Sequence, residues 1–269
     1  MFENKSTFSS GIRVYHGQRR FLMLTPTYMV DRSAHPYRRL SATLILGCSA
    51  PLLLDAGERK PFETRAVLIG PNVVRRRTMG QNCDVAMFDF PMVSPEYRAI
   101  SHILEHNPIV ELDFKRCEAL LPRLCDASQN TVDSTTINSL FADAIEAISG
   151  HTPEANQIDP RIAKALHLID KLEFDQVSLE SLGQSLHLSK SRLSHLFKQE
   201  TGFSIAQYAR WVAVWKTTER WSQGRKLSDV AHEVGFYDQA HLHRAFNEVF
   251  GWNPSVAIDP AEVTLIRCE

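Results

Sequence analysis

Two similar stretches carry the clearest structural signal in the chain: LGQSLHLSKSRLSHLFKQETG at residues 182–202 and VAHEVGFYDQAHLHRAFNEVFG at residues 230–251. The later parts of the two stretches match at an offset of 49 positions, where Leu193, Phe197 and Gly202 recur as Leu242, Phe246 and Gly251. The earlier parts match at an offset of 48, where Leu179, Leu182, Gly183 and Leu186 recur as Leu227, Val230, Ala231 and Val234.

Each repeat predicts a helix, a short turn and a second helix. Ser189 and Asp238 stand where the second helix begins, and both residue types are favoured N-caps. The small residues Gly183 and Ala231 stand where two helices would have to approach closely. This is the layout of a helix-turn-helix, whose second helix enters the major groove of DNA.

The second helix of the first repeat, residues 189–202, is amphipathic. Leu193, Leu196 and Phe197 form its inner face, and no acidic residue occurs between positions 189 and 198. Such a charge pattern suits a groove lined by phosphates, and Ser, His and Arg side chains also bond base edges. The candidate DNA-binding residues of this helix are Lys190, Ser191, Arg192, Ser194, His195 and Lys198.

The corresponding helix of the second repeat, residues 238–251, buries Leu242, Ala245, Phe246 and Val249. Gln and Asn pair with adenine through two hydrogen bonds, and Arg does so with guanine. The candidate DNA-binding residues here are Gln239, His241, His243, Arg244 and Asn247. For the histidines the alternative is an ordinary solvated surface position.

A third helix is expected between the two repeats, from its cap at Ser204 to Gly224. About 20 residues would give roughly 30 Å, close to the roughly 34 Å between successive major-groove faces on one side of B-DNA. A single chain could then place both recognition helices in adjacent segments of the groove. Trp211, Trp215 and Trp221 are expected to pack in the core of this helix rather than to form a ligand cage.

These motifs resemble the DNA-binding domain of the AraC/XylS family of transcription regulators. The resemblance rests on LSKSRLSHLFKQETGFS and LSDVAHEVGFYDQAHLHRAFNEVFGWNPS, with the family's GF turn at Gly235–Phe236 and its closing G-x-x-P-S at Gly251 to Ser255. It implies a regulator that binds double-stranded promoter DNA in a sequence-specific way and more often activates than represses, with RNA polymerase as a second partner. The linker helix departs from the family pattern at Ala213, Val214 and Thr217, where many members carry an Arg-Leu pair before an Ala.

The first half of the chain predicts a different architecture. Five short apolar runs, separated by turn residues, predict an antiparallel sandwich or small barrel over residues 1–92: FLMLT, SATLILGC, PLLLD, RAVLIG and VAMFDF. Helices are expected over 94–106, 111–126 and 134–149. We therefore predict an α+β chain: an effector-binding and dimerisation domain at 1–150, a linker at 151–159, and an all-α domain with two helix-turn-helix units at 160–258.

The N-terminal half also resembles the cupin-like barrel that family members use to bind effectors and to dimerise. This implies a homodimer and a small-molecule effector, with His35, Arg38 and Arg75 as candidate contacts; a solvated strand end or turn is the alternative for all three. Arg75 takes the approximate place of a metal-binding His, and His35 has no second His two positions away. The pair His102 and His106 lacks a third ligand, so no metal or other cofactor is expected.

Composition limits the remaining function classes. The net charge is −1, and residues 160–257 hold twelve Lys and Arg against ten Asp and Glu, so a DNA-binding surface must concentrate its cations on one face. The five cysteines form no CxxC pair, which favours free thiols in a reducing cytoplasm, with a redox sensor as the alternative. No apolar run is long enough to span a membrane. No convergent catalytic residues indicate an enzyme, although a barrel enzyme fused to a helical domain, or a regulator that acts by protein contact without an effector, stays an alternative.

Overall fold

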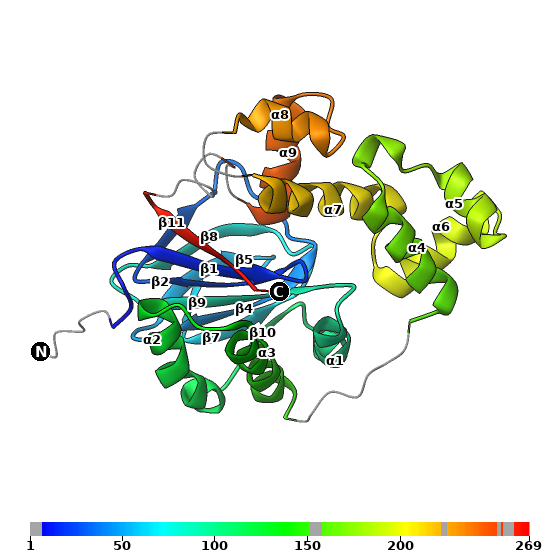
Figure 1. Cartoon of the computed structure of the whole chain (residues 1–269). Coiled ribbons are helices and arrows are strands. Elements are labelled where there is room, and N and C mark those ends of the chain that lie inside the picture. Colours follow the sequence, from blue (N-terminus) through cyan, green and yellow to red (C-terminus); the bar gives the residue numbers. More distant parts are fainter. Residues whose placement is uncertain (1–6, 151–157, 222–224, 252–253, 255–260, 269) are drawn as a thin grey trace, which may run out of the picture. The chain divides into compact units, whose positions relative to one another are not determined.

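The computed structural model describes residues 7–150, 158–221, 225–251, 254 and 261–268. The chain divides into two compact units, of which the first comprises Met1–Ala155 and Ser255–Glu269 and the second Asn156–Pro254. The first unit is rich in strands and the second is helical, which confirms the predicted fold class (Figure 1). The boundaries proposed at 150/151 and 258 lie at residues outside this description and stay a prediction.

The first unit contains two sheets (Figure 1). The larger has the strand order β10-β7-β4-β9-β2-β1-β11 and the smaller β3-β8-β5-β6. The strands are β1 (Ile12–Gly17), β2 (Arg20–Thr25), β3 (Tyr28–Asp31), β4 (Ser41–Gly47), β5 (Leu52–Ala56), β6 (Phe62–Thr64), β7 (Ala66–Ile69), β8 (Arg75–Gly80), β9 (Val85–Pro91), β10 (Ile109–Glu111) and β11 (Val263–Arg267). The five apolar runs found in the sequence form β2, β4, β5, β7 and β9, so the predicted strands are confirmed.

Three helices cover one face of the larger sheet (Figure 1): α1 (Pro95–Leu104), α2 (Leu121–Gln129) and α3 (Ser134–Ser149). The ring of Phe141 on α3 meets Phe88 and Phe90 of β9 edge-on, with ring centroids 5.3 and 5.8 Å apart. The opposite face packs on the smaller sheet, where Arg75 of β8 donates from Nη2 to Oγ1 of Thr43 on β4 at 3.0 Å. Every residue of β4 is buried because both of its faces are covered.

The predicted helix over 111–126 is wrong in its bounds. Its first residue belongs to β10, a 3-10 helix (η1) runs over Phe114–Leu120, and α2 begins at Leu121. Asp113 accepts a hydrogen bond from the backbone of Lys115 and starts η1. Pro122 stands in the first turn of α2, where its missing N–H costs nothing, so it favours a new helix start there. The expected helices over 94–106 and 134–149 are confirmed as α1 and α3.

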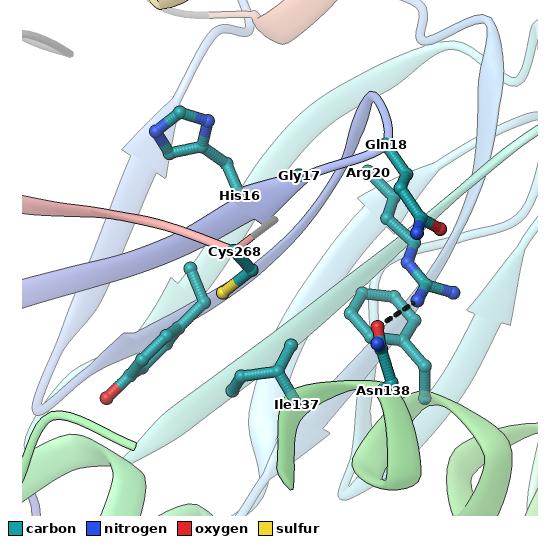
Figure 2. A pocket seen from close by; sticks show the side chains of 9 residues that line it. His16, Gly17, Gln18, Arg20, Ile137, Asn138 and Cys268 are labelled. Carbon is teal, nitrogen blue, oxygen red and sulfur yellow. Dashed lines mark hydrogen bonds between the residues drawn. The ribbon is translucent and has the colours of Figure 1, made fainter. Parts of the chain in front are cut away.

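The C-terminal strand β11 was not foreseen. It pairs in parallel with β1 at the edge of the larger sheet, from Ile12 beside Val263 to His16 beside Arg267. Cys268 donates its backbone N–H to the carbonyl of His16 at 2.8 Å, and Figure 2 shows Cys268 against Gly17. Both segments belong to the first unit. The second unit is therefore inserted between two parts of the first unit rather than appended to its end.

The second unit contains α4 (Pro160–Lys171), a 3-10 helix η2 (Phe174–Gln176), α5 (Leu179–Leu186), α6 (Lys190–Thr201), α7 (Ile205–Arg220), α8 (Leu227–Glu233) and α9 (Gln239–Phe250). Pro160 opens α4 as the sequence predicts, with Asp159 as its N-cap. None of the helices within the described ranges is both long and apolar enough to cross a membrane.

The approach of β11 to Gly17 makes a testable prediction. A Cβ at Gly17 would lie 1.9 Å from the carbonyl oxygen of Cys268, so Gly17→Ala should detach the end of β11. Backbone amides of 263–268 should then exchange hydrogen faster, as measured by mass spectrometry. Gly11→Ala is the matched control, because its Cβ would meet nothing within 4 Å. Unchanged protection in Gly17→Ala would contradict this account of the contact.

Candidate nucleic-acid interface

The first helix-turn-helix consists of α5 and α6. Ser178 and Ser189 are the N-caps of the two helices, and α5 ends at His187 in the left-handed conformation with φ 54°. The backbone N–H of Leu188 then donates to the carbonyl of Gly183 at 2.9 Å. A Cβ at Gly183 would lie 2.8 Å from the carbonyl oxygen of Leu188, which confirms that a small residue is needed where the chain turns back.

The second helix-turn-helix, formed by α8 and α9, repeats this geometry. Gly235 adopts the left-handed conformation with φ 89°, and Phe236 donates its N–H to the carbonyl of Ala231 at 2.9 Å. Asp238 caps α9 by accepting from the backbone N–H of His241 at 2.6 Å. This turn is one residue longer than the turn of the first helix-turn-helix, because Tyr237 stands between Phe236 and the N-cap Asp238.

The six candidate residues of α6 are all exposed, while Leu193, Leu196 and Phe197 are buried beneath them. The helix therefore presents one continuous polar face, with Ser189 as its N-cap. Lys190 forms an ion pair with Glu180 of α5 at 2.6 Å, and this pair holds the pKa of Glu180 below its usual range. Arg192 and Lys198 form no ion pair among the residues of the described ranges.

The five candidate residues of α9 are placed less uniformly. Gln239 and Arg244 are exposed, whereas His243 and Asn247 are half-buried. Asn247 donates to the carbonyl of His243 at 3.1 Å. His241 packs edge-on against Phe174 and Phe236, with ring centroids 5.9 and 5.1 Å apart, so its ring supports the turn.

The connecting helix α7 is shorter than the sequence predicts. Ser204 caps it as expected, but the helix ends at Arg220, and the proposed end at Gly224 lies outside the described residues. Sixteen residues correspond to about 24 Å of helix. Arg220 is held at the helix end by Glu173 at 2.7 Å and by the carbonyl of Glu233 at 2.8 Å. Trp211 and Trp215 are buried in the core, as their spacing predicts.

Two exposed residues at the start of α9 escaped the sequence analysis. Tyr237 is 84% exposed, and Ala240 is exposed on the same turn as Gln239. A signal for Tyr237 was available, because the offset between the repeats changes from 48 to 49 at this position. Ala240 carries no polar group, so nothing in its residue type pointed to DNA.

The structure exposes two of the three candidate effector residues and buries the third, although the backbone of Tyr37, next to Arg38, pairs with that of Arg75. His35 and Arg38 are exposed, and Arg38 donates to the carbonyl of Asn72 at 2.8 Å. Arg75 is fully buried between the sheets beside two other buried charged groups, Arg39 and Asp89. Arg39 pairs with Asp89 at 3.5 Å. Burial lowers the pKa of Arg75 to about 10 and raises the pKa of Asp89.

The arrangement around Arg75 leaves hydrogen-bonding capacity unused. Its Nε and Nη1 atoms have no hydrogen-bond partner among the residues that the structure describes. With Asp89 ionised, the three buried groups Arg39, Arg75 and Asp89 carry one more positive than negative charge. A buried unpaired donor costs free energy, so this cluster would gain from an added hydrogen-bond acceptor.

Other features of the first unit are weaker candidates for a ligand site. A cavity of about 10 Å³ lies beside Gly17, Arg20 and Cys268 (Figure 2), which is room for about one water molecule. Arg20 there donates to Oδ1 of Asn138 at 2.7 Å and lies over the ring of Phe141. Within the described part of the chain, no group of three or more His, Cys, Asp or Glu residues could hold a metal ion.

Comparison with known proteins agrees with this geometry. Residues 182–258 match a family model described as a helix-turn-helix domain. The chain is 33% identical over 130 residues to the arabinose operon regulatory protein of Escherichia coli (strain K12), which covers 44% of this chain and 41% of that protein. The chain thus spans less than half the length of this curated relative.

Solved structures extend the likeness to the whole fold. A crystal structure of an apo ToxT variant from Vibrio cholerae strain SCE256 matches 90% of this chain and 97% of its own, with a TM-score of 0.57 and 10% identity. Wild-type ToxT of the same strain, solved with an unsaturated fatty acid bound, matches 87% of this chain and 93% of its own, with a TM-score of 0.51 and 12% identity. At such identity the likeness shows the fold alone.

The second unit is therefore a DNA-binding domain with two helix-turn-helix units joined by a buried helix. The family model matches part of the chain, and the chain resembles AraC/XylS-type regulators such as the arabinose operon regulatory protein.

The close turn at Gly183 makes a prediction about stability. Gly183→Ala should lower the free energy of unfolding of the second unit by about 1–3 kcal/mol, because overpacking against a backbone carbonyl outweighs the better helix propensity of Ala. All four Trp residues lie in 211–252, so Trp fluorescence during urea unfolding reports on this unit. The exposed neighbour Gln184→Ala is the control. Equal or higher stability of Gly183→Ala would show that Leu188 moves aside freely.

Proposed function

We propose that the chain binds specific sites in double-stranded promoter DNA and regulates transcription, more often as an activator, and that it is not an enzyme. The observation that carries this proposal is the pair of recognition helices, α6 and α9, each with a buried apolar face and an exposed polar face within one unit. Base edges would be read by side chains of these helices, and phosphates would be bound by the cations that flank them.

The two recognition helices should contribute different kinds of DNA contact, to base edges and to phosphates. Arg244 is exposed near the middle of α9, and Lys198 is exposed near the end of α6, farther from the helix start that enters the groove. If Arg244 bonds guanine, Arg244→Ala should cost about 1–3 kcal/mol and relax the preference at one base pair. If Lys198 binds phosphate, Lys198→Ala should weaken all sequences alike and reduce the salt slope by about one.

The measurement is an anisotropy titration of the full chain on its preferred site, on single-base variants and on random DNA, at several salt concentrations. The preferred site is first selected from a random pool. Lys115→Ala removes the same charge from an exposed position in the first unit and should leave binding unchanged. The orientation of the helices is wrong if Arg244→Ala weakens every sequence alike while Lys198→Ala changes base preference.

We also propose that the first unit binds a small effector that carries one negative charge. The support is the buried cluster of Arg39, Arg75 and Asp89, with its excess positive charge and the two N–H donors of Arg75 that lack partners within the described residues. A carboxylate would supply both the missing charge and the missing acceptors, since guanidinium groups bind carboxylates through two parallel hydrogen bonds. The fatty acid bound by ToxT carries such a group. His35 and Arg38, which are exposed, would act only at an entrance to this site.

This proposal predicts that small monocarboxylates stabilise the full chain in a thermal-shift assay. A series of acids of increasing chain length should raise Tm, and the matching primary amides should not, because a neutral amide leaves the excess charge uncompensated. Arg75→Gln should abolish the shift, whereas the control Arg116→Gln, at an exposed position outside the proposed site, should keep it. Equal effects of acids and amides on Tm would refute an anionic effector.

Three further parts of the proposal concern context. A homodimer is proposed from the resemblance to the family alone. The apolar residues of α1, α2 and α3 pack onto the sheet and are not available to a second copy. Large exposed hydrophobic residues in the described ranges are limited to Met29, Tyr237 and Leu265, so an apolar patch on these helices does not explain dimerisation. RNA polymerase is proposed as a partner of the activating form. Promoter DNA as the target would place the protein in the cytoplasm.

A further inference from the structure

We propose that Tyr237 is a DNA contact of the second helix-turn-helix. Its hydroxyl donates a hydrogen bond to a phosphate oxygen of the DNA backbone at the point where α9 enters the major groove, and this contact positions the helix. The inference rests on the proposed DNA-binding function and adds a residue that was not among the DNA-binding candidates predicted from the sequence.

Tyr237 is the most exposed large hydrophobic residue of the described chain, at 84%, compared with 48% for Met29 and 36% for Leu265. Met29 and Leu265 both belong to the first unit. Tyr237 instead directly precedes Asp238, the N-cap of α9. The N-terminal residues of a recognition helix are those that meet the DNA, so the exposed ring lies at the functional end of the helix.

Comparison of the two turns shows that Tyr237 is an inserted residue. His187 and Gly235 are equivalent, since both have a left-handed backbone conformation and Gly235 follows His187 at the repeat offset of 48 positions. The next residues, Leu188 and Phe236, make the same backbone hydrogen bond at 2.9 Å to the carbonyls of Gly183 and Ala231. In the first helix-turn-helix the N-cap Ser189 follows Leu188 directly. In the second helix-turn-helix Tyr237 stands between Phe236 and the N-cap Asp238. No residue of the first turn corresponds to it.

A role for the Tyr237 ring in folding does not fit its exposure. A hydrophobic residue just before an N-cap commonly packs on the fourth residue of the helix, which here is Leu242. Leu242 is completely buried, while most of the Tyr237 side chain faces solvent. The ring therefore adds little to the packing of the turn and is available to a partner.

The backbone that precedes Tyr237 is held firmly. Phe236 is buried with its ring 5.2 Å from that of Phe174, and Phe174 donates its N–H to the carbonyl of Val234 at 3.0 Å. A Cβ at Gly235 would lie 2.7 Å from the backbone N of Asp175, so the turn is pressed against η2. A side chain on such a base loses little backbone entropy when it binds DNA.

The distribution of charge explains why the second helix-turn-helix would use a neutral contact to DNA. Helix α6 carries Lys190, Arg192 and Lys198, whereas Arg244 is the one Lys or Arg in the sequence of α9. Phosphates are also bound by Tyr side chains. A neutral donor adds affinity without neutralising a phosphate, so it should not change the number of counterions released.

The test compares the full chain with Tyr237→Phe and Tyr237→Ala on the preferred site, on single-base variants and on random DNA, across several salt concentrations. Tyr237→Ala should weaken binding about tenfold on every sequence, which corresponds to one hydrogen bond to a charged group. Tyr237→Phe should show most of that loss. The salt slope and the base preference should match those of the wild type, and Met29→Ala, an exposed position in the first unit, should bind normally.

The outcomes separate the inference from the proposed function. Wild-type binding with unchanged affinity in Tyr237→Ala overturns the inference alone. A change of preference at one base pair in Tyr237→Ala also overturns it, because the side chain would then read a base rather than bind the backbone. Full affinity in Tyr237→Phe assigns the contact to the ring and overturns the phosphate bond. Absence of specific binding by the wild type at low salt overturns the proposed function and this inference together.

Discussion

Burial of helix α7 is the constraint on which the DNA-binding unit depends. Its aromatic residues form a continuous series of ring contacts, from Tyr208 to Trp211 at 5.7 Å, to Trp215 at 6.2 Å, and on to Phe250 of α9 at 5.1 Å. Tyr208 also contacts Phe197 of α6 at 5.8 Å. Because packed aromatic rings leave little freedom of rotation, the same helix holds both α6 and α9 through its ring contacts.

The strand β11 adds a second constraint, on the chain path. Since Val263–Arg267 pairs with β1, the first unit is completed only after the whole DNA-binding unit has been traversed. Both ends of the DNA-binding unit are thereby joined to the first unit.

Local signals made most of the second unit predictable. Caps at Ser189, Ser204 and Asp238 and the small residue at Gly183 act within a few residues of sequence, and the structure has all four as expected. Strand β11 was missed because a distant partner stabilises it. The polar run that forms β8 is held by ion pairs of Arg76 and Arg77 with Asp55, and β11 depends on an edge some 250 positions earlier in the sequence. The burial of Arg75, in contrast to the exposed His35 and Arg38, could not be foreseen either, because it depends on how the sheets pack.

Ion pairs within the second unit explain how a domain with nearly equal numbers of cations and acids can still bind nucleic acid. Several of its cations are engaged with acids outside the recognition helices: Arg161 with Asp159, Arg220 with Glu173, and Arg225 with Glu233. Within the described ranges, Arg192 and Lys198 on α6 and Arg244 on α9 form no ion pair and are exposed. Net charge counts every group equally, whereas a phosphate attracts the cations that lie at the surface it meets. The acids of this unit thus engage several of its cations, while Arg192, Lys198 and Arg244 lie exposed and outside the described ion pairs.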